Sequence, residues 1–199
     1  MKWIVITSPD FLPGEASFID CLFRHGMDLL HLRKPDSTIE LCRQLLHEIP
    51  NEWHNRIVLH DHFQLATEFP LHGVHLNRRN PVSPDNFTGS ISRSCHSLDE
   101  VVESKPNCNY VFLSPIFNSI SKQGYGSAFT PEILEKAAAQ GIIDNKVIAL
   151  GGLSLKCLPQ LKAWHFGGAA FLGDIWQRKD SADVEEYLDS IRLTLTNGH

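Results

Sequence analysis

The stretch Lys146-Val-Ile-Ala-Leu-Gly-Gly-Leu-Ser154 contains the pattern that decides the fold. A short apolar run, 146–150, leads directly into two glycines, and a helical pattern follows over about 154–164. A buried strand that passes through a tight turn into a helix is the repeating unit of a parallel sheet. We therefore predict one βα unit here, with its strand at 146–150.

The same unit recurs along the chain. Apolar runs predicted to be strands lie at 3–6, 29–32, 57–59, 73–76, 90–92, 110–113, 146–150 and 169–172. Helix starts are marked by two capping-box sequences, Ser37-Thr-Ile-Glu40 and Ser97-Leu-Asp-Glu100, and by the Thr130-Pro131 pair. Eight units predict an α/β fold, a single-domain (β/α)₈ TIM barrel over residues 1–199, with an open doubly wound sheet as the alternative.

Composition narrows the class of protein. The 199 residues suffice for one sizeable core, and the net charge of −5 comes without a basic run, so we expect no nucleic-acid partner. No stretch approaches about 18 consecutive apolar residues, so no membrane partner is expected. Five scattered cysteines without a CxxC pair favour reduced thiols in the cytoplasm. The sequence leaves open whether the chain forms a homodimer.

Polar residues gather where the predicted strands end, which is where the active site of such a barrel lies. They are Thr7, His31, Arg33, His60, Asp61, His75, Asn77, Ser94, His96, Ser114, residues 119–122, Gly151, Gly152, Gly173 and Asp174. We expect them to surround one site.

Glycines after the last two strands predict a phosphate site. Gly151, Gly152 and Gly173 let the backbone approach an anion, and helix N-termini offer free N–H groups there. The alternative for the glycine pair is a plain tight turn. The loop after the sixth strand adds two hydroxyls and a positive charge from Ser119, Ser121 and Lys122. The alternative for this loop is a solvated segment without a ligand.

Three further side chains are candidates for chemistry. Arg33 suits a phosphate or carboxylate, or else a structural ion pair. Asp61 suits Mg²⁺, a pair with Arg33, or a cap on the following helix. His96 suits proton transfer near pH 7, or else a hydrogen bond to the backbone at the start of a helix. The pair of histidines in His60-Asp61-His62 lacks carboxylate partners, so a zinc site is not expected.

These residues stand in a pattern that resembles the thiamin phosphate synthase/TenI family of (β/α)₈ barrels. The resemblance runs from His31 to about Ile175. Its segments are His31-Leu-Arg33, Gly73-Val-His-Leu76, Arg93-Ser-Cys-His-Ser97, Ser114-Pro-Ile-Phe-Asn-Ser-Ile-Ser-Lys122 and Ala149-Leu-Gly-Gly152. It implies a phosphorylated thiazole as the small-molecule ligand, gripped by Ser119, Ser121 and Gly152.

The resemblance implies two alternative reactions. Synthases of the family join an aminopyrimidine pyrophosphate to thiazole phosphate with Mg²⁺ and release pyrophosphate. TenI-type members need no cofactor and aromatise a thiazole phosphate carboxylate by moving a proton. A non-catalytic ligand-binding barrel is the third alternative.

Departures from the synthase pattern favour the TenI type. His31 and Pro35 stand where the pattern has glutamine and lysine, His60 stands for asparagine, and Asn80 stands for a metal carboxylate. Lys34, Arg78 and Arg79 are candidate replacements for the missing lysine.

The TenI-type pattern, His-x-Arg and Arg-Ser-x-His-Ser, is present instead. We expect His96 to carry the proton, with Arg33 and His31 also catalytic. Lys122, His60, His75 and Ser94 are expected to contact the substrate or its pyrophosphate, and Asp61 to bind Mg²⁺ only in a synthase.

Overall fold

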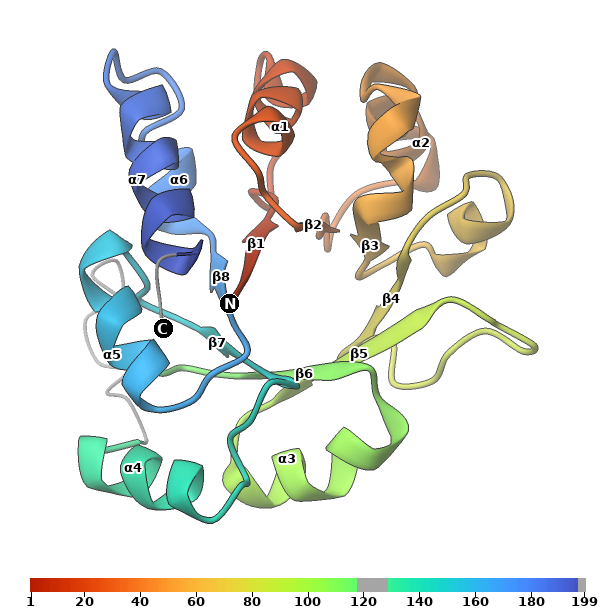
Figure 1. Ribbon diagram of the computed structural model, residues 1–199. Coiled ribbons are helices and arrows are strands. Elements are labelled where there is room, and N and C mark those ends of the chain that lie inside the picture. Colours follow the sequence, from red (N-terminus) through yellow and green to blue (C-terminus); the bar gives the residue numbers. More distant parts are fainter. Residues whose placement is uncertain (118–128, 197–199) are drawn as a thin grey trace.

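The computed structural model describes residues 1–117 and 129–196, and they form one closed parallel barrel (Figure 1). Its strands pair in chain order, and the last pairs with the first. They are β1 (Lys2–Ile6), β2 (Leu29–Leu32), β3 (Ile57–Leu59), β4 (Gly73–Leu76), β5 (Ser90–Cys95), β6 (Tyr110–Leu113), β7 (Val147–Leu150) and β8 (Gly168–Phe171). The predicted barrel is confirmed, and the open sheet is excluded because β1 and β8 pair along four residues.

Helices surround the barrel on its outer face (Figure 1). The α-helices are α1 (Glu15–Arg24), α2 (Ile39–Glu48), α3 (Leu98–Ser104), α4 (Pro131–Ala139), α5 (Leu158–Ala163), α6 (Gly173–Trp176) and α7 (Val184–Thr196). Short 3₁₀ helices add η1 (Asn51–Arg56), η2 (Phe63–Thr67), η3 (Lys105–Asn107) and η4 (Leu155–Cys157). Only η2 lies between β3 and β4, and residues 77–89 between β4 and β5 contain no helix. These short crossings let so small a chain close a barrel. In the described part of the chain, no helix has the length and apolar character needed to cross a membrane.

The predicted strands match closely, and the capping predictions need small corrections. The β5 strand continues to Cys95, beyond the predicted 90–92. Thr38, not Ser37, caps α2 by accepting from the N–H of Leu41, because the Ser37 hydroxyl donates to the carbonyl of Lys34 instead. Thr130 caps α4 with Pro131 in its first turn, as predicted.

Two apolar regions stabilise the barrel. The larger lies between the strands and the surrounding helices. The smaller fills part of the barrel interior with Ile4, Ile6, Leu29, Tyr110, Phe112, Ile148 and Ala170. Apolar side chains in this interior come mainly from β1 and β6–β8, so the sector lined by β2–β5 is left to polar groups.

A buried ion pair joins the segment after β2 to α1. The Lys34 ammonium contacts both Glu15 carboxylate oxygens, at 2.7 and 2.8 Å, and donates to the carbonyl of Asp10 at 2.8 Å. The Lys34 side chain is fully buried. The suggestion that Lys34 neutralises a pyrophosphate is therefore wrong: its charge is used inside the scaffold.

We predict that Lys34→Ala lowers the free energy of unfolding by about 3–5 kcal/mol, because it leaves a buried carboxylate without its partner. Urea unfolding measures this change. Arg43→Ala is the matched control, since it breaks the exposed pair with Glu68 and is expected to change little. Equal losses in the two variants would contradict a structural role for the Lys34–Glu15 pair.

Candidate active site

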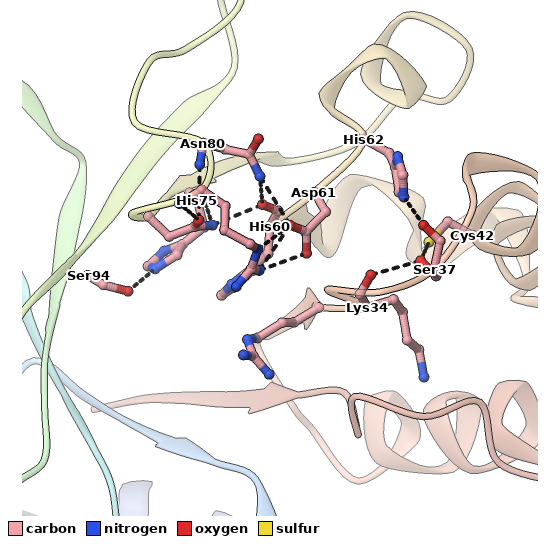
Figure 2. Close-up of polar contacts among 12 residues, drawn as sticks. Lys34, Ser37, Cys42, His60, Asp61, His62, His75, Asn80 and Ser94 are labelled. Carbon is pink, nitrogen blue, oxygen red and sulfur yellow. Dashed lines mark hydrogen bonds and ion pairs between the residues drawn. The ribbon is translucent and has the colours of Figure 1, made fainter.

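Three histidines from neighbouring strands meet inside the barrel; two of them, His60 and His75, are seen in Figure 2. His31 lies on β2, His75 lies on β4 and His60 directly follows β3. All three are buried. His31 points inward because it lies two residues after Leu29, which also faces the interior, and residues two apart on a strand share a face. The predicted strand-end histidines are thus brought together.

Hydrogen bonds use both ring nitrogens of His31 and of His75. His31 Nδ1 lies 2.9 Å from His60 Nε2, and His31 Nε2 lies 2.7 Å from the hydroxyl of Tyr110. His75 Nδ1 and Nε2 each lie 2.8 Å from a serine hydroxyl, those of Ser92 and Ser94. His31 and His75 therefore act on a ligand only through these partners, whereas His60 keeps Nδ1 unbonded among the described residues.

Burial makes these imidazoles neutral. It lowers the pKa of His31 and of His60 well below the ordinary value and lowers the pKa of His75 to about 3. Positive neighbours act in the same direction, since Arg93 further lowers the pKa of His75. Neutral imidazoles carry one donor and one acceptor each, which suits a continuous hydrogen-bonded network.

Asp61 is held by an arginine. Its carboxylate accepts from Arg79 Nη2 at 2.9 Å and from Arg79 Nε at 3.2 Å, and from the amide of Asn80 at 3.1 Å (Figure 2). The alternative of an ion pair with Arg33 is not observed, because the loop after β4 places Arg79 on this carboxylate instead. Asp61 does not cap η2, whose N-cap position is His62.

Arg33 is an uncommitted cation of this region. Its guanidinium makes no hydrogen bond or ion pair with the described residues, although its backbone N–H donates to Thr7. Burial and the nearby charge of Arg79 lower the pKa of Arg33. Asp61 and Asp36 also act on Arg33, but neither pairs with its guanidinium, which therefore remains available to an anionic ligand.

The residues present do not fit a Mg²⁺ ion. Mg²⁺ requires several oxygen ligands. Asp61 supplies the carboxylate at this place, Asn80 stands where a second would be needed, and Arg79 covers the carboxylate oxygens. Over 1–117 and 129–196, the side-chain clusters able to ligate a metal are His31–His60–His75 and Cys21–His25–Glu185, and neither includes Asp61.

His96 lies at the start of α3 and is exposed. Its Nδ1 lies 3.1 Å from the carbonyl oxygen of Ser114, which can only accept a hydrogen bond and thereby fixes the hydrogen on Nδ1. The backbone-bonded alternative is thus observed. This hydrogen bond leaves the lone pair on Nε2. His96 can therefore bond to the backbone and still be a candidate for proton transfer.

A pocket of about 390 Å³ lies at the ends of β7 and β8. Gly151, Gly152 and Gly173 line it, together with Ser154 and Asp174. Gly151 has φ +99°, and a Cβ there would lie 2.9 Å from Pro115, so the turn requires glycine. Ser119, Ser121 and Lys122, the other predicted phosphate ligands, lie outside the described residues.

Sequence reasoning missed two members of the site and did not predict the partner of a third. Tyr110 and Ser92 contact the histidines, and Arg79 was considered only as a replacement for a lysine. Strand alternation was a usable signal for Tyr110, because it shares the inward face with Phe112, and for Ser92, because it shares the inward face with Ser94. The position of Arg79 in a loop without regular structure carried no such signal.

Comparisons with known proteins agree on one family. Residues 4–175 match the family model described as thiamine monophosphate synthase. The chain is 26% identical over 196 residues to a protein of Klebsiella pneumoniae named thiamine-phosphate synthase, covering 86% of this chain and 90% of that protein. A Photorhabdus laumondii protein of the same name is 27% identical over 175 residues, covering 83% and 81%.

Solved structures give the same picture. A thiamine phosphate pyrophosphorylase from Bacteroides thetaiotaomicron superposes with a TM-score of 0.91 at 41% identity, with all of both chains covered. One from Pyrococcus furiosus gives 0.73 at 18% identity, covering 98% of this chain and 95% of the other, and supports the fold alone. The names of these relatives support the synthase alternative more directly than the tautomerase.

We predict that the buried histidines make stability fall as the pH drops from 6.5 to 5. Their pKa values are lowered in the folded chain, so the unfolded chain takes up protons first and stability is lost on acidification. Each histidine contributes a slope of up to about 1.4 kcal/mol per pH unit. Urea unfolding of the wild type and of His75→Asn across this range measures it. An unchanged slope in the variant would contradict the neutral state of His75.

Proposed function

The chain belongs to the thiamine monophosphate synthase family, and on that premise we propose that it isomerises a thiazole phosphate carboxylate by proton transfer without a metal. One observation carries the choice between the reactions of the family. The carboxylate that would bind Mg²⁺ is engaged by Arg79 and Asn80. A proton transfer on one substrate needs no ion there, whereas departure of pyrophosphate commonly requires one.

The phosphate and the carboxylate of this substrate find separate partners. The pocket beside Gly152 and Gly173 suits the phosphate, since the first N–H groups of a helix have no partner within it. Arg33 and Arg79, across the barrel mouth after β2 and β4, suit the carboxylate. Ser119, Ser121 and Lys122 are proposed to complete the phosphate site.

His96 is the proposed proton carrier. Its Nε2 removes a proton from a ring carbon, and a proton is returned at another carbon, so the substrate isomerises with no net gain or loss of atoms. The carbonyl of Ser114 stabilises the imidazolium formed in between. In this scheme His31 is a positioning residue, because it reaches the ligand only through His60.

The synthase is the second candidate. The names of the relatives favour it. Arg33 and Arg79 would then bind the pyrophosphate, as guanidinium groups pair with phosphate oxygens in a bidentate manner. These relatives are enzymes by name, which gives the non-catalytic barrel no support.

The proposed compartment is the cytoplasm, where such biosynthetic substrates occur.

A product assay separates the two candidates. We expect the protein to convert thiazole phosphate carboxylate to its aromatic isomer with EDTA present, and His96→Ala to lower kcat by about 10²–10⁴-fold. His47→Ala, at an exposed histidine of α2, is the control. Formation of thiamin phosphate from both synthase substrates with Mg²⁺, at a rate above the isomerisation, would establish the synthase instead.

We predict that Gly173→Ala weakens binding of thiazole phosphate without unfolding the protein. A Cβ at Gly173 meets no atom within 4 Å, so its methyl group would project into open space beside the pocket. Calorimetric titration measures binding and thermal unfolding measures the fold. Unchanged affinity would place the phosphate elsewhere.

A further inference from the structure

Helices α1 and α7 lie side by side at the place where β1 pairs with β8 (Figure 1). Two polar contacts join them, since His25, at the C-terminal end of α1, lies 2.7 Å from the Asp189 carboxylate and 3.9 Å from that of Glu185. Cys21 lies one helical turn before His25, whose backbone N–H donates to the Cys21 carbonyl. Cys21, His25 and Glu185 form the α1–α7 cluster, in which one ligand atom from each residue lies within 4.8 Å of the other two.

The His25 ring is oriented in the manner of a metal ligand. Asp189 lies one turn after Glu185 on α7, and its carboxylate oxygen is 2.7 Å from His25 Nδ1. A carboxylate can only accept, so the hydrogen of the neutral ring is held on Nδ1 and the lone pair is on Nε2. Nε2 is the nitrogen that lies 3.9 Å from Glu185 Oε2. Histidines that bind metals commonly have such a carboxylate on their other ring nitrogen.

Negative charge gathers around the half-buried Cys21. Burial raises the pKa of its thiol, and three carboxylates raise that pKa further, those of Glu185, Asp20 and Asp189. Asp20 is compensated by an ion pair with Arg24, which leaves Glu185 and Asp189 facing the thiol and the imidazole. The surroundings therefore favour a positive charge at the sulfur, either its own proton or a cation that replaces it.

The three ligand types together fit Zn²⁺. Zinc takes thiolate sulfur, imidazole nitrogen and carboxylate oxygen, whereas Mg²⁺ and Ca²⁺ take oxygen ligands. A tetrahedral zinc site keeps its nitrogen and oxygen ligand atoms roughly 3.3 Å apart. The observed 3.9 Å between His25 Nε2 and Glu185 Oε2 can shorten to this distance by a small rotation of Glu185, whose side chain is 73% exposed.

We propose that Cys21 Sγ, His25 Nε2 and the Glu185 carboxylate bind one Zn²⁺ ion, with water as the fourth ligand, and that this ion connects α1 to α7. Binding releases the thiol proton to the solvent and involves no oxidation or reduction. The two helices supply groups that are 164 residues apart. Because the unfolded chain does not hold these groups together, the ion favours the closed barrel.

The proposed zinc site is separate from the candidate active site. Helix α1 runs back from the end of β1 to the start of β2, so its last turn lies at the end of the barrel opposite to the mouth. No residue of the α1–α7 cluster takes part in the proposed isomerisation. The inference therefore does not depend on the proposed function.

Two other interpretations compete with a zinc site between α1 and α7. In one, His25 is protonated and pairs with Asp189 and Glu185, and Cys21 has no part. In the other, an ion binds the three interior histidines of the candidate active site, whose ligand atoms also lie within 4.8 Å of one another. Two of those rings, however, have hydrogen-bond partners on both nitrogens, which leaves neither ring a free lone pair for an ion.

Metal binding to the full-length protein tests the proposal. The protein, without an affinity tag and stripped of metal with EDTA, is titrated with Zn²⁺ and separately with Co²⁺. We expect one ion per chain with a Kd below about 10 µM near neutral pH. The unfolding midpoint is expected to rise by about 5–10 °C when free zinc exceeds the Kd about 100-fold. With Co²⁺ we expect a thiolate-to-metal charge-transfer band, which imidazole and carboxylate ligands do not produce.

Three variants each remove one ligand: Cys21→Ser, His25→Gln and Glu185→Gln. We expect each to weaken zinc binding at least about 100-fold, and Asp189→Asn, which only releases the His25 ring, to weaken it about 10–100-fold. The cobalt charge-transfer band is expected to persist in Asp189→Asn and to disappear in Cys21→Ser.

Cys157→Ser and Glu186→Gln are the matched controls and are expected to bind zinc as the wild type does. Cys157 is the other half-buried thiol. Glu186 is exposed and adjoins Glu185 on α7. Because Glu185 is exposed as well, Glu185→Gln tests the ligand set even if Cys21→Ser does not fold.

Two kinds of result would overturn the proposal. One is a wild-type Kd above about 10 µM, or an affinity that Cys21→Ser and Glu185→Gln leave unchanged, as expected if His25 only forms ion pairs. The other is zinc binding that is lost in His75→Asn and kept in Cys21→Ser, which would assign the ion to the interior histidines. Neither result involves isomerase activity, so this proposal and the proposed function fail separately.

Discussion

Closure of eight short strands into one barrel is the constraint on which the rest of the structure depends. Alternate side chains of every strand must then fill a narrow interior. On β1 and β6–β8 they are apolar and pack directly. On β2, β4 and β5 they include His31, His75, Ser92 and Ser94 beside the apolar Leu29, and buried polar groups of this kind must satisfy one another. The histidine network is the solution that closure imposes on these residues.

The charged side chains near the barrel mouth, unlike the polar groups of the interior, are not all paired with one another. Lys34 is withdrawn into an ion pair with Glu15, and Arg79 is brought forward onto Asp61. Arg33 is left without a partner in the described residues. Guanidinium groups at the mouth suit an anionic ligand, and their contact with Asp61 is the chemical reason that the side chains here differ from a set built to hold Mg²⁺.

The sequence predicted the strands well because buried parallel strands are short, apolar and separated by helical patterns. Thr130 and the 146–154 stretch also behaved as expected, since caps and glycine turns are local features. The pair between Asp61 and Arg33 failed for the opposite reason. Which cation reaches Asp61 depends on the path of residues 77–89, which have no regular pattern. Ser37 was predicted to cap α2, but its hydroxyl donates to the Lys34 carbonyl and Thr38 caps the helix instead.

The sequence by itself determined the barrel, the polar strand ends and the resemblance to one enzyme family. These follow from periodicity and from motifs a few residues long. Only the tertiary structure decided which polar groups touch. Tyr110 and His31 are 79 residues apart and join by a 2.7 Å bond because closure places β2 and β6 across one interior. Contacts between distant strands depend on register and shear, which no local pattern encodes.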